Sequence, residues 1–294
     1  MKIAVTGVAG DVGGFVTREL AAAGHEPVGV DLRPPDGLPL ARFVRGSVGN
    51  PDDLRDAFTD CDAVIHLAAI RDLGIAPDET LFEVNVVGTF NALEAAVACG
   101  VPRFVLASSE AVLGLGSGDS EAVPDYLPMD EEHPLRPRDV YALSKVLGED
   151  MCASYAARGS MSTICLRTAY VFSLDWREDA LLSLTSESRG RRGVWSYIDA
   201  RDAARAYRLA CEVEDVQHEK LFVVASDIRS TAPTAEILRR HFPSVPLRTS
   251  LDEFAGVISG SRAKTVLGFE PRHSWRDDVS VAALDAGTPR PSAP

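Results

Sequence analysis

Short β-forming runs alternate with longer helical segments through the first two-thirds of the chain. Strands are predicted at residues 2–6, 26–31, 41–45, 63–67, 103–107 and 162–167. Several of them are continuous runs of Val, Ile and Leu, which is typical of strands buried on both faces. Helices are predicted between them at residues 13–23, 52–58, 80–99 and 141–157. This alternation predicts an α/β fold built on a doubly wound parallel sheet.

The final third of the chain has shorter and more broken segments. A helix over 200–213 and a strand over 220–226 are nevertheless predicted to pack on the main domain, which we assign to residues 1–167. Residues 168–286 are assigned mostly to a small C-terminal substrate-binding lobe. The tail at 287–294 consists of Pro, Gly and small polar residues with one Arg, and is predicted to be disordered.

Composition excludes several kinds of partner. The net charge of −13 repels phosphate backbones, so no nucleic-acid partner is expected. No apolar stretch approaches the roughly 20 residues of a membrane helix. The first strand begins almost at the initiator Met, which leaves no room for a signal peptide, so a cytoplasmic protein is expected. The five cysteines and six histidines form no ligand motif, so no metal site is expected either.

A glycine-rich turn joins the first strand to the first helix. Gly7, Gly10 and Gly13 lie in the segment TGVAGDVG, and Asp11 and Val12 open the helix. Such glycines let the backbone turn tightly and approach a pyrophosphate, which the N–H groups of the helix N-terminus then bind. The turn therefore predicts a Rossmann-type dinucleotide site. The alternative is a tight strand–helix turn that binds nothing.

Asp31 ends the second strand, at the distance from the glycines where dinucleotide-binding folds place an acidic residue. Its carboxylate would accept hydrogen bonds from the adenosine ribose and repel a 2′-phosphate. This favours NAD over NADP. Arg33 lies two residues later, where it could receive a 2′-phosphate, so the two residues argue in opposite directions.

Tyr141 and Lys145 stand four residues apart on one face of a predicted helix. A nearby ammonium group favours the phenolate and lowers the pKa of a tyrosine from about 10. Tyr141 could then take the proton of a substrate hydroxyl while hydride passes to the cofactor, or return it in the reverse direction. The alternative interpretation is an ordinary helix surface, because this spacing often occurs by chance.

Ser108 and Ser109 directly follow the strand at 103–107. Residues at the carboxyl edge of a parallel sheet line the ligand crevice, so a hydroxyl there can orient a substrate oxygen. For Ser108 a turn or helix-cap role is an equally good interpretation.

With these residues in place, the chain resembles the extended short-chain dehydrogenase/reductase family, in particular its NAD-dependent sugar epimerase/dehydratase branch. The resemblance covers nearly the whole length. It rests on TGVAGDVG at 6–13, Asp31, HLAA at 66–69, NVVGT at 85–89, Ser108-Ser109, YxxxK at 141–145 and Leu166-Arg167.

The resemblance implies NAD as cofactor and Ser109, Tyr141 and Lys145 as the catalytic residues. Tyr141 and Lys145 would also contact the cofactor, and Lys145 could hold the nicotinamide ribose. Further residues would lie against the cofactor: Ser47, Val48, Leu67, Ala68, Ala69, Asn85 and Ala107. In family members the helices that match 80–99 and 141–157 often pair across a dimer, which implies a homodimer here.

The substrate side departs from the family pattern. Tyr170 stands where nucleotide-sugar enzymes usually carry Asn, and Trp195 where they carry an Arg that contacts the diphosphate. Dehydratases carry Asp-Glu after the catalytic Thr, whereas Ser109 is followed by Glu110 and Ala, which disfavours dehydration. The substrate-binding residues are predicted to be Arg71, Ser108, Ser109, Glu110, Tyr170 and Trp195.

Three functions follow as hypotheses. The first is an NAD-dependent oxidoreductase that transfers a hydride between the nicotinamide and an alcohol carbon of a free sugar, a uronic acid or a related small polyol, with Tyr141 as acid/base. The second is a nucleotide-sugar 4-epimerase with tightly bound NAD. The third is a non-catalytic NAD-binding protein.

Overall fold

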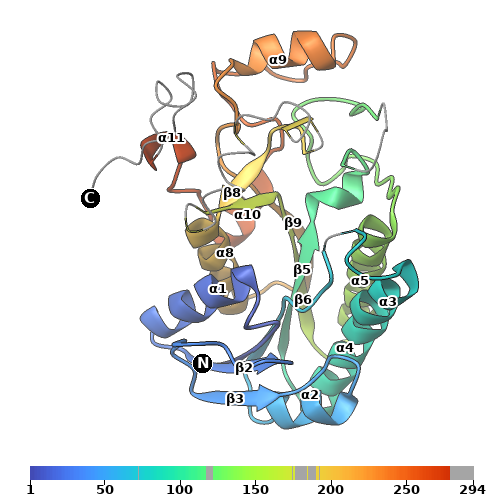
Figure 1. Cartoon of the computed structure of the whole chain (residues 1–294), viewed down its shortest axis with the longest axis vertical. Helices are drawn as coiled ribbons and strands as arrows, with labels where there is room; N and C mark the ends of the chain where they lie inside the picture. The colour runs from blue at the N-terminus through green and yellow to red at the C-terminus, as the bar shows by residue number, and fades with distance from the viewer. Residues whose placement is uncertain are drawn as a thin grey trace.

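A computed structural model of the chain describes residues 1–71, 73–116, 122–173, 175, 184, 190–191 and 193–278. Two layers of helices enclose a parallel sheet, and a smaller lobe lies beyond the carboxyl ends of the strands (Figure 1). The predicted tail at 287–294 lies outside the described residues.

The sheet has seven strands in the order β3-β2-β1-β4-β5-β6-β9, and each neighbouring pair is parallel. The strands are β1 (Lys2–Thr6), β2 (Glu26–Asp31), β3 (Arg42–Arg45), β4 (Ala63–His66), β5 (Arg103–Ser109), β6 (Ser162–Thr168) and β9 (His218–Val223). The strand order reverses between β1 and β4, which is where ligands bind in open α/β sheets. The predicted Rossmann-type fold is confirmed.

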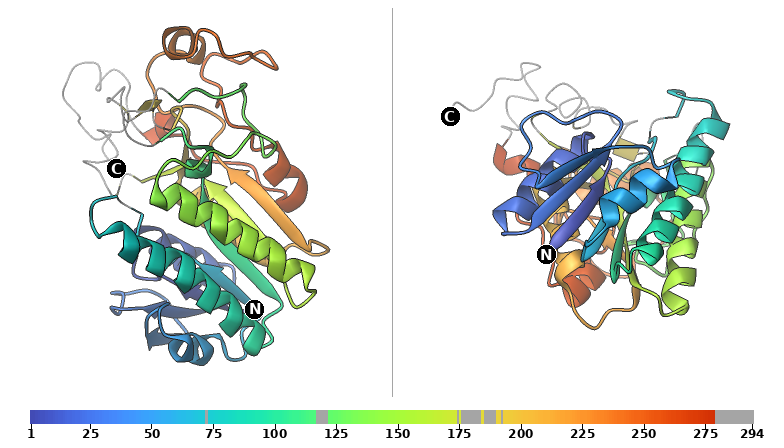
Figure 2. Two further views of the ribbon diagram at one scale, coloured as in Figure 1. Left: turned by 90° about the vertical axis from the view of Figure 1, so that its right-hand side faces the viewer. Right: turned by 90° about the horizontal axis from the view of Figure 1, so that it is seen from below.

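Successive residues of each strand face opposite helical layers, because side chains alternate along a strand. Ile3 and Val5 of β1 belong to the core beneath α1 (Asp11–Ala22) and α8 (Ala200–Glu212). Ala4 belongs to the core on the other face, beneath α2 (Pro51–Phe58), α4 (Gly88–Ala98) and α5 (Val140–Ala157). Figure 2 shows these two helical layers on either side of the sheet.

The helix predicted at 80–99 is one continuous run with a change of winding. It consists of α3 (Asp78–Phe82), a π-helical segment at Glu83–Val87 and α4. Single π-helical turns are frequent at functional sites, and this one carries Asn85. The run is also long and apolar enough, by length and composition, to cross a membrane. This corrects the expectation that no apolar stretch approaches that length, although buried helices of soluble proteins meet the same criterion.

The lobe is built from short elements, of which the sequence predicts the helices near residues 234–241 and 261–267. A two-stranded parallel sheet pairs β7 (Tyr170–Phe172) with β8 (Tyr197–Asp199). The helices are α9 (Thr234–His241), α10 (Ser261–Leu267) and α11 (Trp275–Asp278). The lobe has its own apolar cluster around Trp195 and Phe242, whereas α8 and β9 pack on the main sheet.

Candidate active site

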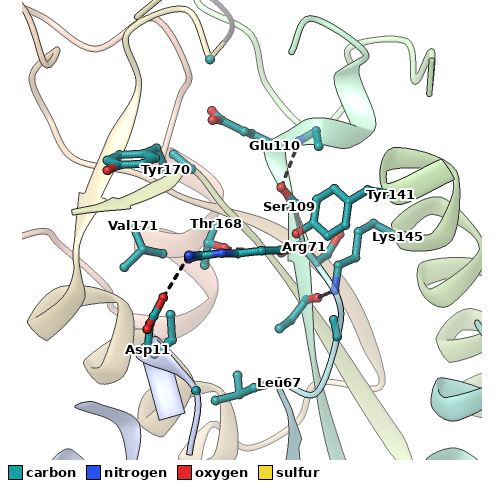
Figure 3. A pocket seen from close by; sticks show the side chains of 18 of the residues that line it. Asp11, Leu67, Arg71, Ser109, Glu110, Tyr141, Lys145, Thr168, Tyr170 and Val171 are labelled. Carbon is teal, nitrogen blue, oxygen red and sulfur yellow. Dashed lines mark hydrogen bonds and ion pairs between the residues drawn. The ribbon is translucent and has the colours of Figure 1, made fainter. Parts of the chain in front are cut away.

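A cavity of about 860 Å³ lies at the carboxyl ends of β1, β4, β5 and β6, between the sheet and the lobe. The glycine turn after β1 forms one end of it. Tyr141 and Lys145 of α5 line one side, and Glu110 and Tyr170 lie at the top (Figure 3). Among the described residues no group of three or more His, Cys, Asp or Glu side chains could hold a metal ion.

The glycine turn leaves no space for side chains. Gly7 has φ +72°, and a Cβ on it would lie 2.8 Å from the backbone N of Ala68. A Cβ on Gly13 would lie 2.5 Å from the carbonyl oxygen of Gly7. The absence of side chains exposes the backbone at the start of α1, where Gly10 is the N-cap residue and Asp11 and Val12 follow. This is the backbone cradle that a pyrophosphate requires, so the residues present fit a dinucleotide.

Asp31 lies at the carboxyl end of β2, next to the glycine turn. Its Oδ2 accepts a hydrogen bond of 2.9 Å from the backbone N–H of Ala9, and its Oδ1 one of 3.3 Å from the N–H of Arg33. The carboxylate thus holds the turn in place. Arg33 lines the cavity.

Tyr141 and Lys145 point toward the cavity from adjacent turns of α5 (Figure 3). The Nζ of Lys145 donates a 2.7 Å hydrogen bond to the carbonyl oxygen of Ala107 and lies 5.4 Å from the centre of the Tyr141 ring. Burial lowers the pKa of Lys145 to about 8, while the nearby carboxylate of Glu149 opposes this effect. The pair predicted from spacing alone therefore stands together in the cavity.

Ser108 and Ser109 both line the cavity but have different partners. Ser109 caps a 3₁₀ turn at Glu110–Leu113, its Oγ accepting a bond from the N–H of Ala111. Because the Ser109 oxygen is the acceptor in this bond, its own hydroxyl proton can be donated to a substrate oxygen. Ser108 is buried and donates a 2.6 Å hydrogen bond to Glu149. The sequence leaves a substrate-binding role and a turn or helix-cap role equally open for Ser108. In the structure its hydroxyl proton is donated to Glu149.

Glu149 is a buried residue of this site that sequence reasoning missed. Both nitrogens Nε and Nη2 of Arg167 lie 2.8 Å from its carboxylate. Burial acts to raise the pKa of Glu149, but the bonds from Arg167 and Ser108 outweigh it and keep this pKa below its usual range. The one available signal was its position one helical turn after Lys145.

Asn85 fixes the loop after β4 from the π-helical segment. Its Oδ1 accepts from the N–H of Ile70 at 2.8 Å, and its Nδ2 donates to the carbonyl oxygen of Ile70 at 2.9 Å and to Ser144 at 3.2 Å. In this structure Asn85 acts on the cavity through the loop, whose residues Leu67 and Ala69 line it. Ala68 contributes its backbone against Gly7.

Three predicted site residues lie away from the cavity lining. Ser47 accepts a hydrogen bond from Gly49 N–H, and Val48 packs against Gly88. Trp195 is 4% exposed and packs edge-on against Phe242 in the apolar cluster of the lobe. Among the described residues, Asp31, Ala68 and Asn85 also stand outside the cavity lining, so six of the predicted site residues do.

The remaining predicted substrate residues face the cavity, together with several that the sequence did not indicate. Arg71 reaches across it to Asp11, with 3.0 Å between Nη2 and Oδ2 (Figure 3). Glu110 and Tyr170 line its upper part. The further lining residues include Thr168, Tyr207 and Arg229. Thr168 lies at the end of β6, Tyr207 in α8 and Arg229 in the lobe. No local sequence motif connects these three segments, so the sequence did not indicate them.

Residues 3–225 match the family model described as NAD dependent epimerase/dehydratase family. The chain belongs to this family. It is thus an NAD-dependent enzyme of the extended short-chain dehydrogenase/reductase type, as the sequence predicted. The L-arabinose 1-dehydrogenase (NAD(P)(+)) of Haloferax volcanii is 33% identical over 216 residues, which cover 72% of this chain and 82% of that enzyme.

Other relatives match over a shorter region. The UDP-glucose 4-epimerase of Rhizobium meliloti is 31% identical over 176 residues, which cover 56% of this chain and 50% of the epimerase. This chain therefore matches about half of the length of that enzyme.

Solved structures resemble the chain over nearly its full length. A short-chain dehydrogenase/reductase superfamily protein of Agrobacterium tumefaciens with bound NAD is 28% identical, with a TM-score of 0.72 over 93% of both chains. MoeE5 in complex with UDP-glucuronic acid and NAD is 26% identical, with a TM-score of 0.69 over 94% of this chain and 95% of that one. The prediction of NAD as cofactor is confirmed.

Proposed function

We propose that this enzyme is an NAD-dependent dehydrogenase that oxidises an alcohol carbon of a free sugar or a closely related small polyol. The observation that carries the proposal is the buried, uncharged Trp195 where nucleotide-sugar enzymes place a diphosphate-binding Arg. The L-arabinose 1-dehydrogenase of Haloferax volcanii, of which the chain covers 82%, supports the same substrate class.

The side chains in the cavity have distinct proposed roles. NAD, held by the glycine turn and Asp31, supplies the hydride acceptor when bound. Tyr141 takes the proton of the substrate hydroxyl as general base, and Lys145 favours its phenolate because an ammonium group stands beside the ring. Ser109 donates its hydroxyl proton to the substrate oxygen and orients it. Loss of the hydroxyl proton to Tyr141, together with loss of a hydride from the same carbon to NAD, would leave a carbonyl group on the product.

A nucleotide-sugar 4-epimerase is the second candidate. It is favoured by the several UDP-glucose 4-epimerases among the relatives. An epimerase would use Tyr141 in both directions and retain its cofactor between turnovers. A non-catalytic role is disfavoured because Tyr141 and Lys145 stand together in the cavity.

One experiment separates these functions. The purified protein is incubated with NAD and a panel of aldoses, uronates and UDP-sugars, while absorbance at the NADH band and epimer formation are both followed. We expect NADH to accumulate when a free sugar is supplied, in proportion to the amount of that sugar. Epimer formation without net NADH, from protein that purifies with NAD bound, would replace the dehydrogenase assignment with the epimerase. Absence of both signals would favour the non-catalytic role.

We extend the proposal to assembly, location and domain boundaries. A cytoplasmic homodimer is proposed, with α4 and α5 at the interface and with residues 168–286 as a lobe that covers the substrate. Figure 2 (left) shows these two helices side by side on one face of the molecule. Phe90 of α4 and Leu143 of α5 expose 46% and 39% of their surface, and Phe82 of α3 exposes 37%. Exposed apolar side chains of this size are typical of protein interfaces when they form a patch.

Phe90→Glu is expected to convert the dimer into a monomer, because a carboxylate would be buried against a partner's apolar helix. Size-exclusion chromatography with light scattering measures the mass, which should fall from twice 31.5 kDa to that of one chain. Leu32→Glu, at an exposed position near β2, is the control and should leave the mass unchanged. A wild-type protein that is monomeric throughout would contradict the proposal.

A further inference from the structure

The upper part of the cavity contains a polar cluster that the proposed chemistry does not use. We call the cluster of Glu110, Tyr170, Gly193 and Arg229 the Glu110 subsite. All four residues line the cavity. Ser109 and Glu110 are neighbours in the chain, but the Glu110 side chain points toward the top of the cavity while Ser109 lies beside Tyr141 (Figure 3).

The carboxyl group of Glu110 has unused hydrogen-bonding capacity. Its Oε2 is buried and has no hydrogen-bond partner within the described structure. A buried polar atom without a partner is destabilising, so such atoms in native proteins call for an explanation. Because this one lies on a cavity wall, a bound ligand is the natural partner.

Arg229 is held beside this carboxyl group rather than offered to solvent. It is 4% exposed, its guanidinium carbon lies 4.4 Å from the centre of the Tyr170 ring, and its Nε donates to the carbonyl oxygen of Ser196 at 3.2 Å. Gly193 lies close to both side chains, since a Cβ on it would lie 2.6 Å from Oε1 of Glu110 and 3.5 Å from Nη2 of Arg229. The backbone thus closes tightly around the pair.

The protonation state of Glu110 determines which ligand group fits. Burial raises the pKa of Glu110 to about 8, while Arg229 and the backbone N–H of Tyr170 act to lower it. At neutral pH the group is therefore mostly a neutral acid, which both donates and accepts hydrogen bonds. A hydroxyl group also does both, so it matches Glu110 in either protonation state.

A carboxylate on the ligand fits less well. It can only accept hydrogen bonds, so it requires Glu110 to remain protonated, and two carboxyl groups that share a site disfavour each other's ionised form. Arg229 would attract a carboxylate, but its Nε already bonds to Ser196 and its face covers Tyr170. The atom left without a partner is on Glu110 and not on the guanidinium.

We propose that the Glu110 subsite binds a hydroxyl group of an uncharged polyol and thereby selects neutral sugars over the corresponding uronates. Glu110 is then a specificity-determining residue, distinct from the Tyr141–Lys145 pair. The inference rests on the proposed function only in taking a sugar as the ligand. It adds that this sugar places a hydroxyl group, and not a carboxylate, in the Glu110 subsite.

The test compares wild type, Glu110→Ala and Glu110→Gln with D-glucose, D-galactose, D-xylose and L-arabinose. For the best sugar, each monodeoxy analogue is tested as well, and D-galacturonate is compared with D-galactose. NADH formation gives kcat and KM, and calorimetry on the NAD-saturated protein gives Kd independently of turnover. Val123→Ala, at an exposed position outside the cavity lining, is the matched control and should behave as wild type.

We expect one deoxy analogue to bind wild type about 10- to 100-fold more weakly than its parent, as the loss of one hydrogen bond to a polar acid predicts. Glu110→Ala should weaken the parent sugar to a similar extent and no longer distinguish that analogue. Glu110→Gln should retain most of the affinity. D-Galactose should be preferred to D-galacturonate in wild type.

The proposal is overturned if Glu110→Ala discriminates among the deoxy analogues as wild type does, or if wild type prefers the uronate. Sugar binding that depends on Glu110 without any NADH would refute the dehydrogenase but support the subsite. NADH formation that is unchanged by the Glu110 substitutions would support the dehydrogenase but refute the subsite. If no sugar binds at all, both proposals are refuted.

Discussion

Tyr141→Phe is expected to lower kcat by about 10²- to 10⁴-fold, which is the usual contribution of a positioned general acid or base. The phenyl ring keeps the shape of the side chain and its place 5.4 Å from the Lys145 ammonium, but it has no proton to exchange. NAD binding should change little, because the glycine turn and Asp31 do not contact the phenol oxygen. Initial rates of NADH formation measure the first effect, and cofactor titration by protein fluorescence measures the second.

The matched control is Tyr155→Phe on the same helix. Its hydroxyl bonds to Glu94, away from the cavity, so its loss should leave kcat unchanged. If Tyr141→Phe kept more than a tenth of the wild-type kcat, another group would have to move the proton. If it lost NAD binding as well, the effect would be structural.

Glu149→Leu should destabilise the protein by about 3–5 kcal/mol, because it leaves the guanidinium of Arg167 buried without its carboxylate. Both side chains are almost completely buried, at 2% and 0% exposure, and Arg167 makes two bonds of 2.8 Å to Glu149. Urea denaturation measures the free energy of unfolding. The midpoint of thermal unfolding should fall by roughly 6–20 °C for a chain of this size.

The double variant Glu149→Leu with Arg167→Met provides the internal comparison. Replacing a whole buried ion pair by apolar side chains is often neutral, and Nη1 of Arg167 has no hydrogen-bond partner in the described part of the wild-type chain. Most of the lost stability should therefore return. Arg55→Ala removes an exposed pair with Asp52 and should cost less than about 1 kcal/mol. An equal loss in the single and double variants would contradict this account.

The same pair also gives the wild type a pH dependence of known sign. Because the folded pKa of Glu149 lies below its usual value, its stabilising contribution is present above the unfolded pKa of about 4.3 and is lost as pH falls through the folded pKa. The double variant should lack this part of the acid destabilisation.

The parts of the fold and site that the sequence predicted depend on local patterns. The seven strands of the sheet are short apolar runs, and the glycine turn and the Tyr141–Lys145 spacing lie within one turn or one helix. Each of these features is determined by residues that are close together in the sequence. Parallel pairing then follows from the strand–helix alternation, since the strands must be joined by crossovers.

The parts that the sequence missed depend on contacts between distant segments. Glu149 gains its role from Arg167 and Ser108, and Arg229 reaches Glu110 from more than a hundred residues away. Trp195 was expected at the substrate, but an aromatic side chain packs equally well into an apolar core, and the lobe provides one. β7 and β8 are three residues each, too short to leave a periodic pattern.

The hydrogen bond from Ala9 N–H to Asp31 has a consequence for anyone wishing to change the coenzyme. With Asp31 at the adenosine ribose, as we propose, room for a 2′-phosphate requires removing this carboxylate, yet the same group anchors the glycine turn. A redesign at this single position would loosen the grip on both coenzymes at once. A successful switch therefore needs a second, neutral acceptor for Ala9, so that recognition of the ribose and the shape of the bend are separated.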